Sequence, residues 1–220
     1  ESTRPGAKKI SAALEIKRTA SVIRTICAKT KVAVSIDTRK AAVARAAVES
    51  GAALVNDVSG LTFDPDLAHF CAKENLPVCV MHSQGLPETM QDNPLYDDVV
   101  LDVYDFLDDQ INRLNGQGIA RNCIIADPGI GFGKTMAHNL ALLNKISLFH
   151  SLGVPLLLGV SRKGFIGKIT QENVAEGRVI GSVSAALTGV SQGVQIFRVH
   201  DVRETRQAFD MWQTIMFGIK

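Results

Sequence analysis

Short apolar segments alternate with amphipathic segments of helical spacing along this sequence, and the alternation limits the folds that it can adopt. The apolar segments are continuous, as expected for strands buried on both faces of a parallel sheet. The expected strands occupy residues 32–36, 53–55, 77–81, 122–126, 155–159 and 194–197. The expected helices occupy residues 14–27, 41–50, 65–73, 99–114, 136–150, 175–191 and 204–217. With 220 residues and 46% apolar side chains, the chain can bury the core of one α/β domain, residues 1–220.

Polar side chains of the kind that bind ligands stand at the ends of these strands. They are Asp37, Asn56, His82, Asp127, Lys163, and Arg198 with His200. A (β/α)8 barrel gathers the carboxyl ends of its strands around one mouth, whereas an open doubly wound sheet spreads them along a crevice. The positions of the polar residues therefore favour a (β/α)8 TIM barrel, with six βα units in this chain, over the open sheet.

Residues 127–134, DPGIGFGK, form the most distinctive strand end. Asp127 follows an apolar strand, Pro128 fixes the direction of the chain, and three alternating glycines permit positive φ and the close approach of a ligand or a neighbouring loop. A Walker A loop would need glycine at position 128, and the dinucleotide-binding fingerprint needs a different glycine spacing. The loop therefore predicts a ligand site with a carboxylate at its base. The alternative is a glycine-rich turn in which Asp127 caps the next helix.

The composition argues against several classes of function. A net charge of +2 without a basic stripe makes nucleic acid an unexpected partner. No apolar stretch approaches the roughly 20 residues that span a bilayer, and no signal-peptide pattern is present, so we expect a cytoplasmic protein without a membrane partner. The four cysteines form no Cys-x-x-Cys pair, and the five histidines have no zinc-ligand spacing. We therefore expect reduced core cysteines and no transition metal.

The strand-end residues fall into two chemical groups. The carboxylates of Asp37 and Asp127 and the amide of Asn56 offer acceptors and a donor to a flat heterocycle that bears amino and ring N–H groups. The cationic residues of the last two strand ends suit a phosphate or a pyrophosphate. We therefore expect a substrate with a polar ring and an anionic tail. Each residue alone could instead be a helix cap, a turn residue or half of an ion pair, but their convergence favours one site.

Seven motifs along the chain together resemble dihydropteroate synthase. They are residues 1–6 (ESTRPG), 35–38 (SIDT), 55–58 (VNDV), 81–82 (MH) with Gly85 and Met90, 127–134 (DPGIGFGK), 161–163 (SRK) and 198–201 (RVHD). They occur in the order of the family and at similar spacing, over essentially the whole chain. The resemblance implies a transferase of folate biosynthesis. It would join 6-hydroxymethyl-7,8-dihydropterin pyrophosphate to 4-aminobenzoate, giving 7,8-dihydropteroate and pyrophosphate with the assistance of Mg²⁺.

The resemblance also implies roles for individual residues. The pterin ring would contact Asp37, Asn56, Val58, Met81, Asp127 and Lys163. The pyrophosphate would contact Arg198 and His200. The aminobenzoate would contact Thr3, Arg4, Pro5, Phe132 and Lys163. The catalytic residues would be Lys163, Asp127, Arg198 and His200. Sulfonamides, which mimic 4-aminobenzoate, would be inhibitors, and the family commonly forms homodimers.

The sequence departs from the family pattern in two places. The family opens with two barrel strands and an Asn-Val-Thr-Pro-Asp-Ser-Phe-like loop, whose Asn lies near the metal. We expect this chain to lack both strands and to supply no metal ligand. Gly164 stands where many members have Ser near the aminobenzoate. The alternatives are a methyltetrahydrofolate-binding methyltransferase domain, which would lack the SRK and RVHD motifs, and a truncated barrel that binds pterin without catalysis.

Overall fold

The computed structural model describes residues 9–85, 90 and 93–218. The strands are β1 (Ser35–Asp37), β2 (Leu54–Asp57), β3 (Val78–Met81), β4 (Ile124–Asp127), β5 (Leu157–Leu158) and β6 (Ile196–Phe197). The α-helices are α1 (Ala12–Lys29), α2 (Ala41–Glu49), α3 (Pro65–Lys73), α4 (Val99–Gly116), α5 (Met136–Asn144), α6 (Gly164–Thr170), α7 (Val179–Ser191) and α8 (Val202–Phe217). Short 3₁₀ helices are η1 (Arg121–Cys123), η2 (Ile146–Leu152) and η3 (Glu176–Arg178).

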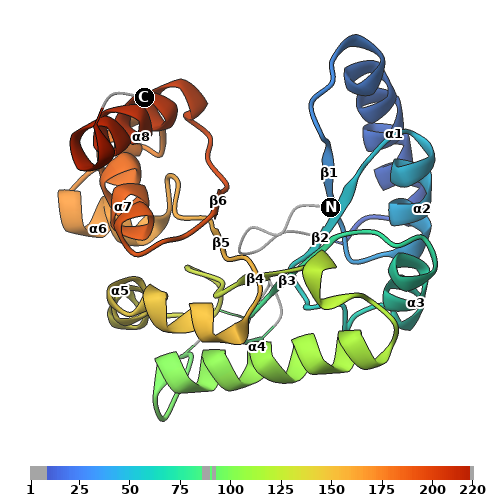
Figure 1. Cartoon of the computed structure of the whole chain (residues 1–220), viewed down its shortest axis with the longest axis horizontal. Coiled ribbons are helices and arrows are strands. Elements are labelled where there is room, and N and C mark those ends of the chain that lie inside the picture. Colours follow the sequence, from blue (N-terminus) through green and yellow to red (C-terminus); the bar gives the residue numbers. More distant parts are fainter. Residues whose placement is uncertain (1–8, 86–89, 91–92, 219–220) are drawn as a thin grey trace.

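The strands form one parallel row in the order of the sequence. β1 to β4 make a four-stranded sheet, and β5 pairs with β6. A parallel bridge between Ala126 and Leu156 joins the two sheets (Figure 1). Because helices connect the successive parallel strands, their carboxyl ends all lie at the same edge of the row. This edge carries the polar residues that the sequence places at the strand ends.

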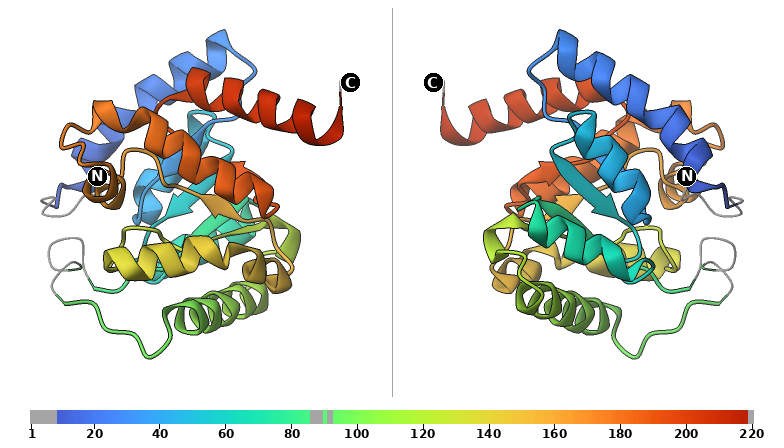
Figure 2. Two further views of the ribbon diagram at one scale, coloured as in Figure 1. Left: turned by 90° about the vertical axis from the view of Figure 1, so that its left-hand side faces the viewer. Right: turned by 90° about the vertical axis from the view of Figure 1, so that its right-hand side faces the viewer.

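The hydrophobic core lies between the strand row and the surrounding helices. Val78 and Val80 of β3 are fully buried, and so are Leu107 and Ile111 of α4, which contacts β3. Figure 2 shows α1, α2 and α3 side by side on one flank, where α2 contacts both of its neighbours. The apolar positions that recur every three or four residues in α4 explain this packing, because they place one stripe of the helix against the sheet.

Several helices begin at capping residues that the sequence supplies. The Asp64 side chain accepts a hydrogen bond from the backbone of Asp66 at the start of α3, and Asp98 does the same at the start of α4. Thr135 and His138 form a reciprocal capping box on α5. These caps fix where the helices start, and α3 has the bounds that the sequence predicts.

Other boundaries differ from the sequence-based expectations. The helix expected at 136–150 ends at Asn144 and continues as η2, and the helix expected from 175 begins as η3 and becomes α-helical at Val179. The short helix α6 was not expected, because its seven residues include two glycines and contain no periodic apolar stripe. All six strands also begin one to three residues later than expected, because strand ends depend on pairing with a neighbour.

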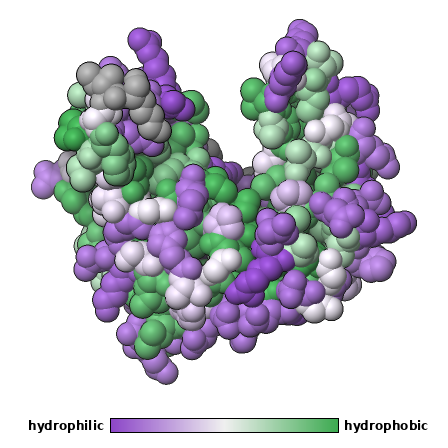
Figure 3. Space-filling view, viewed as in Figure 1, coloured by the Kyte–Doolittle hydropathy of each residue, from purple (hydrophilic) through white to green (hydrophobic). Residues whose placement is uncertain are grey.

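The molecule has two arms that rise on either side of the strand row. The space-filling view shows a notch between the arm of α6, α7 and α8 and the arm of α1 and α2, with apolar surface at its floor (Figure 3).

Cys71 and Cys79 are buried, whereas Cys27 and Cys123 are partly exposed, and all four are free thiols. No helix in the described part of the chain combines the length and apolar character needed to cross a bilayer.

Candidate functional site

Parallel pairing places the predicted pterin ligands next to one another at the carboxyl edge. Asp37 lies opposite Asn56 in the pairing of β1 with β2, and Met81 lies opposite Asp127 in the pairing of β3 with β4. Met81 is 3% exposed and packs close to Gly129. The register therefore brings the carboxylate of Asp37 next to the amide of Asn56, and the carboxylate of Asp127 next to the apolar side chain of Met81.

An ion pair connects the first and the last described strands. Arg198 Nη2, directly after β6, lies 2.9 Å from Asp37 Oδ2 at the end of β1. The side chains are 60% and 29% exposed, respectively. The other oxygen of Asp37, Oδ1, is buried and has no hydrogen-bond partner among the described residues, and the same holds for Asn56 Oδ1. Burial raises the pKa of Asp37 above its ordinary value, although the positive charge of Arg198 acts to lower it.

Asp127 lies beneath the glycine loop at the end of β4. Its Oδ1 accepts a 2.7 Å hydrogen bond from the backbone N–H of Gly129, and the residue is 8% exposed. Burial raises the pKa of the carboxyl group, and the charge of Lys163 opposes this increase. Gly129 has φ +69°, and a Cβ there would lie 1.8 Å from the carbonyl oxygen of His82. Only glycine allows the loop to pack this closely on the segment after β3.

Lys163 crosses the same loop from the opposite side. It precedes α6, and its ammonium group donates to the carbonyl oxygen of Ile130 and lies 4.8 Å from the centre of the Phe132 ring. Burial lowers its pKa to about 8 despite the attraction of Asp127. The structure thus brings together the predicted pterin acid Asp127, the shared residue Lys163 and the predicted aminobenzoate residue Phe132.

The loops after β5 and β6 are joined by two polar contacts. Ser161 Oγ lies 3.0 Å from Nδ1 of His200 and accepts a 3.1 Å hydrogen bond from its backbone N–H. Arg162 donates to both carboxylate oxygens of Asp201, at 3.0 and 2.6 Å. These contacts hold the two loops that carry Lys163, Arg198 and His200 side by side. Burial raises the pKa of Asp127, and the positive charges of Lys163 and Arg198 both lower it.

His82 does not face the site as its position at a strand end suggested. It is 7% exposed, and its Nδ1 lies 2.8 Å from the Nζ atom of Lys134, which is 3% exposed. Sequence reasoning considered Lys134 only as part of a nucleotide-binding motif and did not predict its pairing with His82. The sequence around Lys134 contains no signal that identifies this partner.

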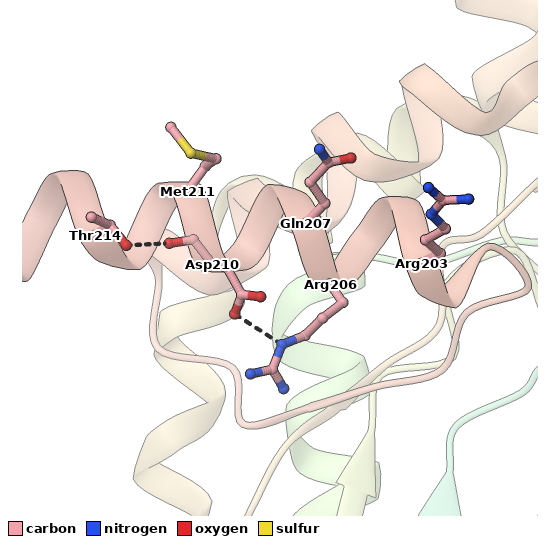
Figure 4. A pocket seen from close by; sticks show the side chains of 6 residues that line it. All are labelled: Arg203, Arg206, Gln207, Asp210, Met211 and Thr214. Atoms are coloured by element: carbon pink, nitrogen blue, oxygen red, sulfur yellow. Dashed lines mark hydrogen bonds and ion pairs between the residues drawn. The ribbon is translucent and has the colours of Figure 1, made fainter. Parts of the chain in front are cut away.

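The described residues include two hollows of very different character. A cavity of about 210 Å³ adjoins the strand ends, and its lining includes Val58, Met90, Phe106 and Phe132. A larger hollow of about 430 Å³ lies along α8 (Figure 4). All of its lining residues are exposed and come from that one helix, and Arg206 pairs there with Asp210 at 2.8 Å. The cavity beside Val58 and Phe132 is therefore the one that belongs to the candidate site.

The predicted aminobenzoate residues Thr3, Arg4 and Pro5 lie outside the described residues. The remaining predicted site residues all lie at or beside the carboxyl edge of the strand row. The site combines partly unsatisfied acceptors, an apolar cavity and a cluster of cationic groups, which suits a polar aromatic ring with an anionic substituent.

A model of the family described as pterin binding enzyme matches residues 1–200. The fold and the site thus define the class of the protein, the pterin-binding enzymes. Dihydropteroate synthase of Escherichia coli (strain K12) is 42% identical over 208 residues, which are 94% of this chain and 73% of that protein. Dihydropteroate synthase of Haemophilus influenzae is 41% identical over 213 residues, 97% of this chain and 77% of that protein. The chain belongs to the dihydropteroate synthase family.

Solved structures agree with this assignment. Yersinia pestis dihydropteroate synthase in complex with a sulfonamide drug superposes with a TM-score of 0.94 at 43% identity, covering 98% of this chain and 78% of that chain. Xanthomonas albilineans dihydropteroate synthase with 4-aminobenzoic acid gives a TM-score of 0.94 at 41% identity, covering 99% and 77%. The family inferred from the motifs and the (β/α)8 barrel fold inferred from the strand ends are therefore confirmed.

Proposed function

We propose that the strand-end site of this chain binds 6-hydroxymethyl-7,8-dihydropterin pyrophosphate and 4-aminobenzoate and joins them into 7,8-dihydropteroate, the reaction of its family. The observation that carries the assignment of the site is a pair of buried acceptor atoms that have no partner among the described residues, Oδ1 of Asp37 and Oδ1 of Asn56. A buried polar atom left unpaired costs about 1–3 kcal/mol. The amino and ring N–H groups of a pterin would supply the missing donors.

The pterin ring would lie between the acids and the apolar walls of the site. Asp37, Asn56 and Asp127 would accept its hydrogen bonds, and Val58 and Met81, which are 6% and 3% exposed, would pack against its faces. Lys163 would donate to the ring from beside Phe132. Arg198 pairs with Oδ2 of Asp37, so Oδ1 of the same carboxylate is the atom that would accept from the ring.

The pyrophosphate would bind to Arg198 and His200, which follow the last strand of the row. Arg198 provides a planar group of N–H donors that can bind two phosphate oxygens at once. Ser161 fixes the orientation of the His200 ring through the contact at Nδ1. The substrate would thus place its uncharged ring among the acceptors and its anionic group among the cations.

The charges of the site suit an ionising substitution. The bond between the pterin methylene carbon and the pyrophosphate oxygen breaks with both electrons on the oxygen, and the methylene becomes a cation stabilised by the ring. The carboxylates of Asp37 and Asp127 favour this positive charge, while Arg198 and His200 stabilise the departing anion. The lone pair of the arylamine then forms the carbon–nitrogen bond, and the amine loses a proton. A neutral arylamine needs no strong base, so the reaction requires no activated nucleophile from the protein.

The aminobenzoate would stack near Phe132 and reach Lys163, with Thr3, Arg4 and Pro5 completing its pocket. The Xanthomonas albilineans relative has been solved with 4-aminobenzoic acid and the Yersinia pestis relative with a sulfonamide drug. A sulfonamide that competes with 4-aminobenzoate for this chain is therefore part of the proposal. Position 164, where many family members have Ser, has room for a side chain, because a Cβ there would meet no atom within 4 Å.

Magnesium assistance remains a prediction of the family resemblance. No group of three or more His, Cys, Asp or Glu side chains within the described part of the chain could hold a metal ion. The steps above use only the side chains of this protein.

We further propose a cytoplasmic homodimer without nucleic-acid or membrane partners. Support for the dimer comes from apolar side chains exposed on α7 and α8, including Ile180 at 82% and Ile215 at 73%. Large exposed apolar side chains on adjacent helices are typical of protein interfaces. Sedimentation velocity measures the oligomeric state directly, and a monomer at micromolar concentration would contradict the dimer.

Calorimetric titration with 6-hydroxymethylpterin tests the assignment of the site. Asp127→Asn should weaken binding by about 1.5–3 kcal/mol, the range for a lost hydrogen bond to a charged group. Asp210→Asn, which changes an exposed acid on α8, is the matched control and should bind like the wild type. Equal affinity of wild type and Asp127→Asn would remove Asp127 from the site.

A further inference from the structure

Lys134 is a buried cation that the proposed reaction does not use. Its Nζ atom has three acceptors, which are Nδ1 of His82 at 2.8 Å, the carbonyl oxygen of Phe132 at 3.0 Å and the carbonyl oxygen of His82 at 3.4 Å. An ammonium group has three N–H donors, so all of them have an acceptor. The contact also fixes the His82 tautomer, because Nδ1 accepts and the proton must lie on Nε2.

These acceptors belong to two different loops of the site. His82 begins the loop that follows β3, and Phe132 belongs to the glycine loop that follows β4. The loops touch closely, since a Cβ at Gly133 would lie 2.3 Å from the carbonyl oxygen of Gln84. Tyr96 adds a 2.7 Å hydrogen bond from its hydroxyl to the carbonyl of Gly133. Lys134 lies buried where the two loops meet.

We propose that Lys134 is a positioning residue of the pterin and aminobenzoate site, which ties the loop after β3 to the glycine loop and supplies a positive charge that acts on Asp127. The inference rests on the proposed function of the site. Asn139 of α5 is a second anchor of the glycine loop, since its side chain accepts a 2.6 Å hydrogen bond from Gly131 and donates to the Thr135 carbonyl at 2.7 Å. Because Asn139 carries no charge, a substitution there tests the anchoring of the loop without changing the charge near Asp127.

The charge of Lys134 acts on Asp127 together with other groups. Around the pair lie His82 from the loop after β3, Lys163 from the loop after β5 and Arg198 after β6. Burial lowers the pKa of Lys134 to about 7, while burial and the adjacent ammonium group lower the pKa of His82 to about 3. Between about pH 3 and pH 7, therefore, Lys134 is charged and His82 is neutral.

The sign of the effect follows from this arrangement. Burial raises the pKa of Asp127, and the positive charge of Lys134 lowers it. Removing that charge should raise the pKa of Asp127 further. Because the carboxylate is the form that accepts hydrogen bonds from the pterin, the loss of affinity at acid pH should then begin at a higher pH than in the wild type. A residue that only holds the loop would weaken binding equally at every pH.

The test compares three variants of the full chain with the wild type by titration with 6-hydroxymethylpterin between about pH 4.5 and 7.5. Lys134→Gln removes the charge and keeps a donor, Lys134→Arg keeps the charge, and Asn139→Ala removes the other anchor. For Lys134→Gln, we expect the ratio of its dissociation constant to that of the wild type to be about threefold to tenfold larger at the acid end of the range than at the neutral end. Lys134→Arg should retain the pH dependence of the wild type, and Asn139→Ala should weaken binding uniformly.

The inference would be overturned if Lys134→Gln lost the same affinity for the pterin at every pH. It would also be overturned if the affinity of Asn139→Ala fell at a higher pH than that of the wild type. Circular dichroism establishes whether each variant is folded. If Lys134→Gln is not folded, Lys134→Arg and Asn139→Ala decide. If affinity falls at a higher pH than in the wild type in either variant, the proposed charge effect is contradicted. If affinity falls at the same pH as in the wild type in both variants, the charge effect is supported. A wild type that binds no pterin, or binds it equally well as Asp127→Asn, would instead refute the proposed function.

Discussion

Replacing Arg198 with alanine should affect the two halves of the substrate in opposite directions. The ion pair between Arg198 and Asp37 has side chains that are 60% and 29% exposed. An ion pair this accessible to water contributes only about 0.2–1 kcal/mol. Its removal frees the Asp37 carboxylate for the pterin, so a plain pterin should bind Arg198→Ala as well as the wild type, or up to about fivefold more tightly.

The pyrophosphate half should lose affinity in the same variant. Hydrogen bonds to charged groups contribute about 1.5–3 kcal/mol. Losing the Arg198 contacts should therefore weaken binding of 6-hydroxymethyl-7,8-dihydropterin pyrophosphate by about 10-fold to 150-fold. Two calorimetric titrations, with this substrate and with 6-hydroxymethylpterin, measure both effects. Arg206→Ala is the matched control, because it removes an exposed, ion-paired arginine from α8. An equal loss for both ligands would refute the reasoning.

Two further substitutions test the energetics of the glycine loop and its acid. The raised pKa of Asp127 means that its contribution to stability is present below the unfolded-state pKa and is lost as pH rises through the folded-state pKa. Urea denaturation should therefore find Asp127→Asn more stable than wild type at neutral pH, with a smaller difference at strongly acid pH, and a difference independent of pH would contradict the burial effect. Gly129→Ala should destabilise the protein by more than about 2 kcal/mol, because φ is +69° and the new Cβ would lie 1.8 Å from the His82 carbonyl oxygen. Gly116→Ala in α4, where a Cβ meets nothing within 4 Å, should be neutral or stabilising by up to about 1 kcal/mol. Similar melting temperatures for the two alanine variants would show that the close contact at Gly129 is not needed.

The order of strands and helices and the residues at the strand ends could be predicted from the sequence. Both signals are local. Continuous apolar segments indicate buried strands, a stripe such as that of α4 indicates an amphipathic helix, and Asp127 follows its strand directly in the chain. A parallel barrel converts that one-dimensional order into a shared edge, so Asp37, Asn56 and Asp127 could be assigned to one site. The helix that escaped prediction, α6, has no extended periodic pattern.

The pairing of side chains was decided only by the tertiary structure. Arg198 and Asp37 are 161 positions apart, and nothing near either residue specifies that they meet. Lys134 and His82 are 52 positions apart, and the burial that removes water from this pair depends on how closely the glycine loop packs on the loop after β3. Sequence patterns report on the backbone path and on which face is apolar. The distance between charges and their exposure to water arise when distant segments pack together, and these two quantities determine pKa values and binding energies.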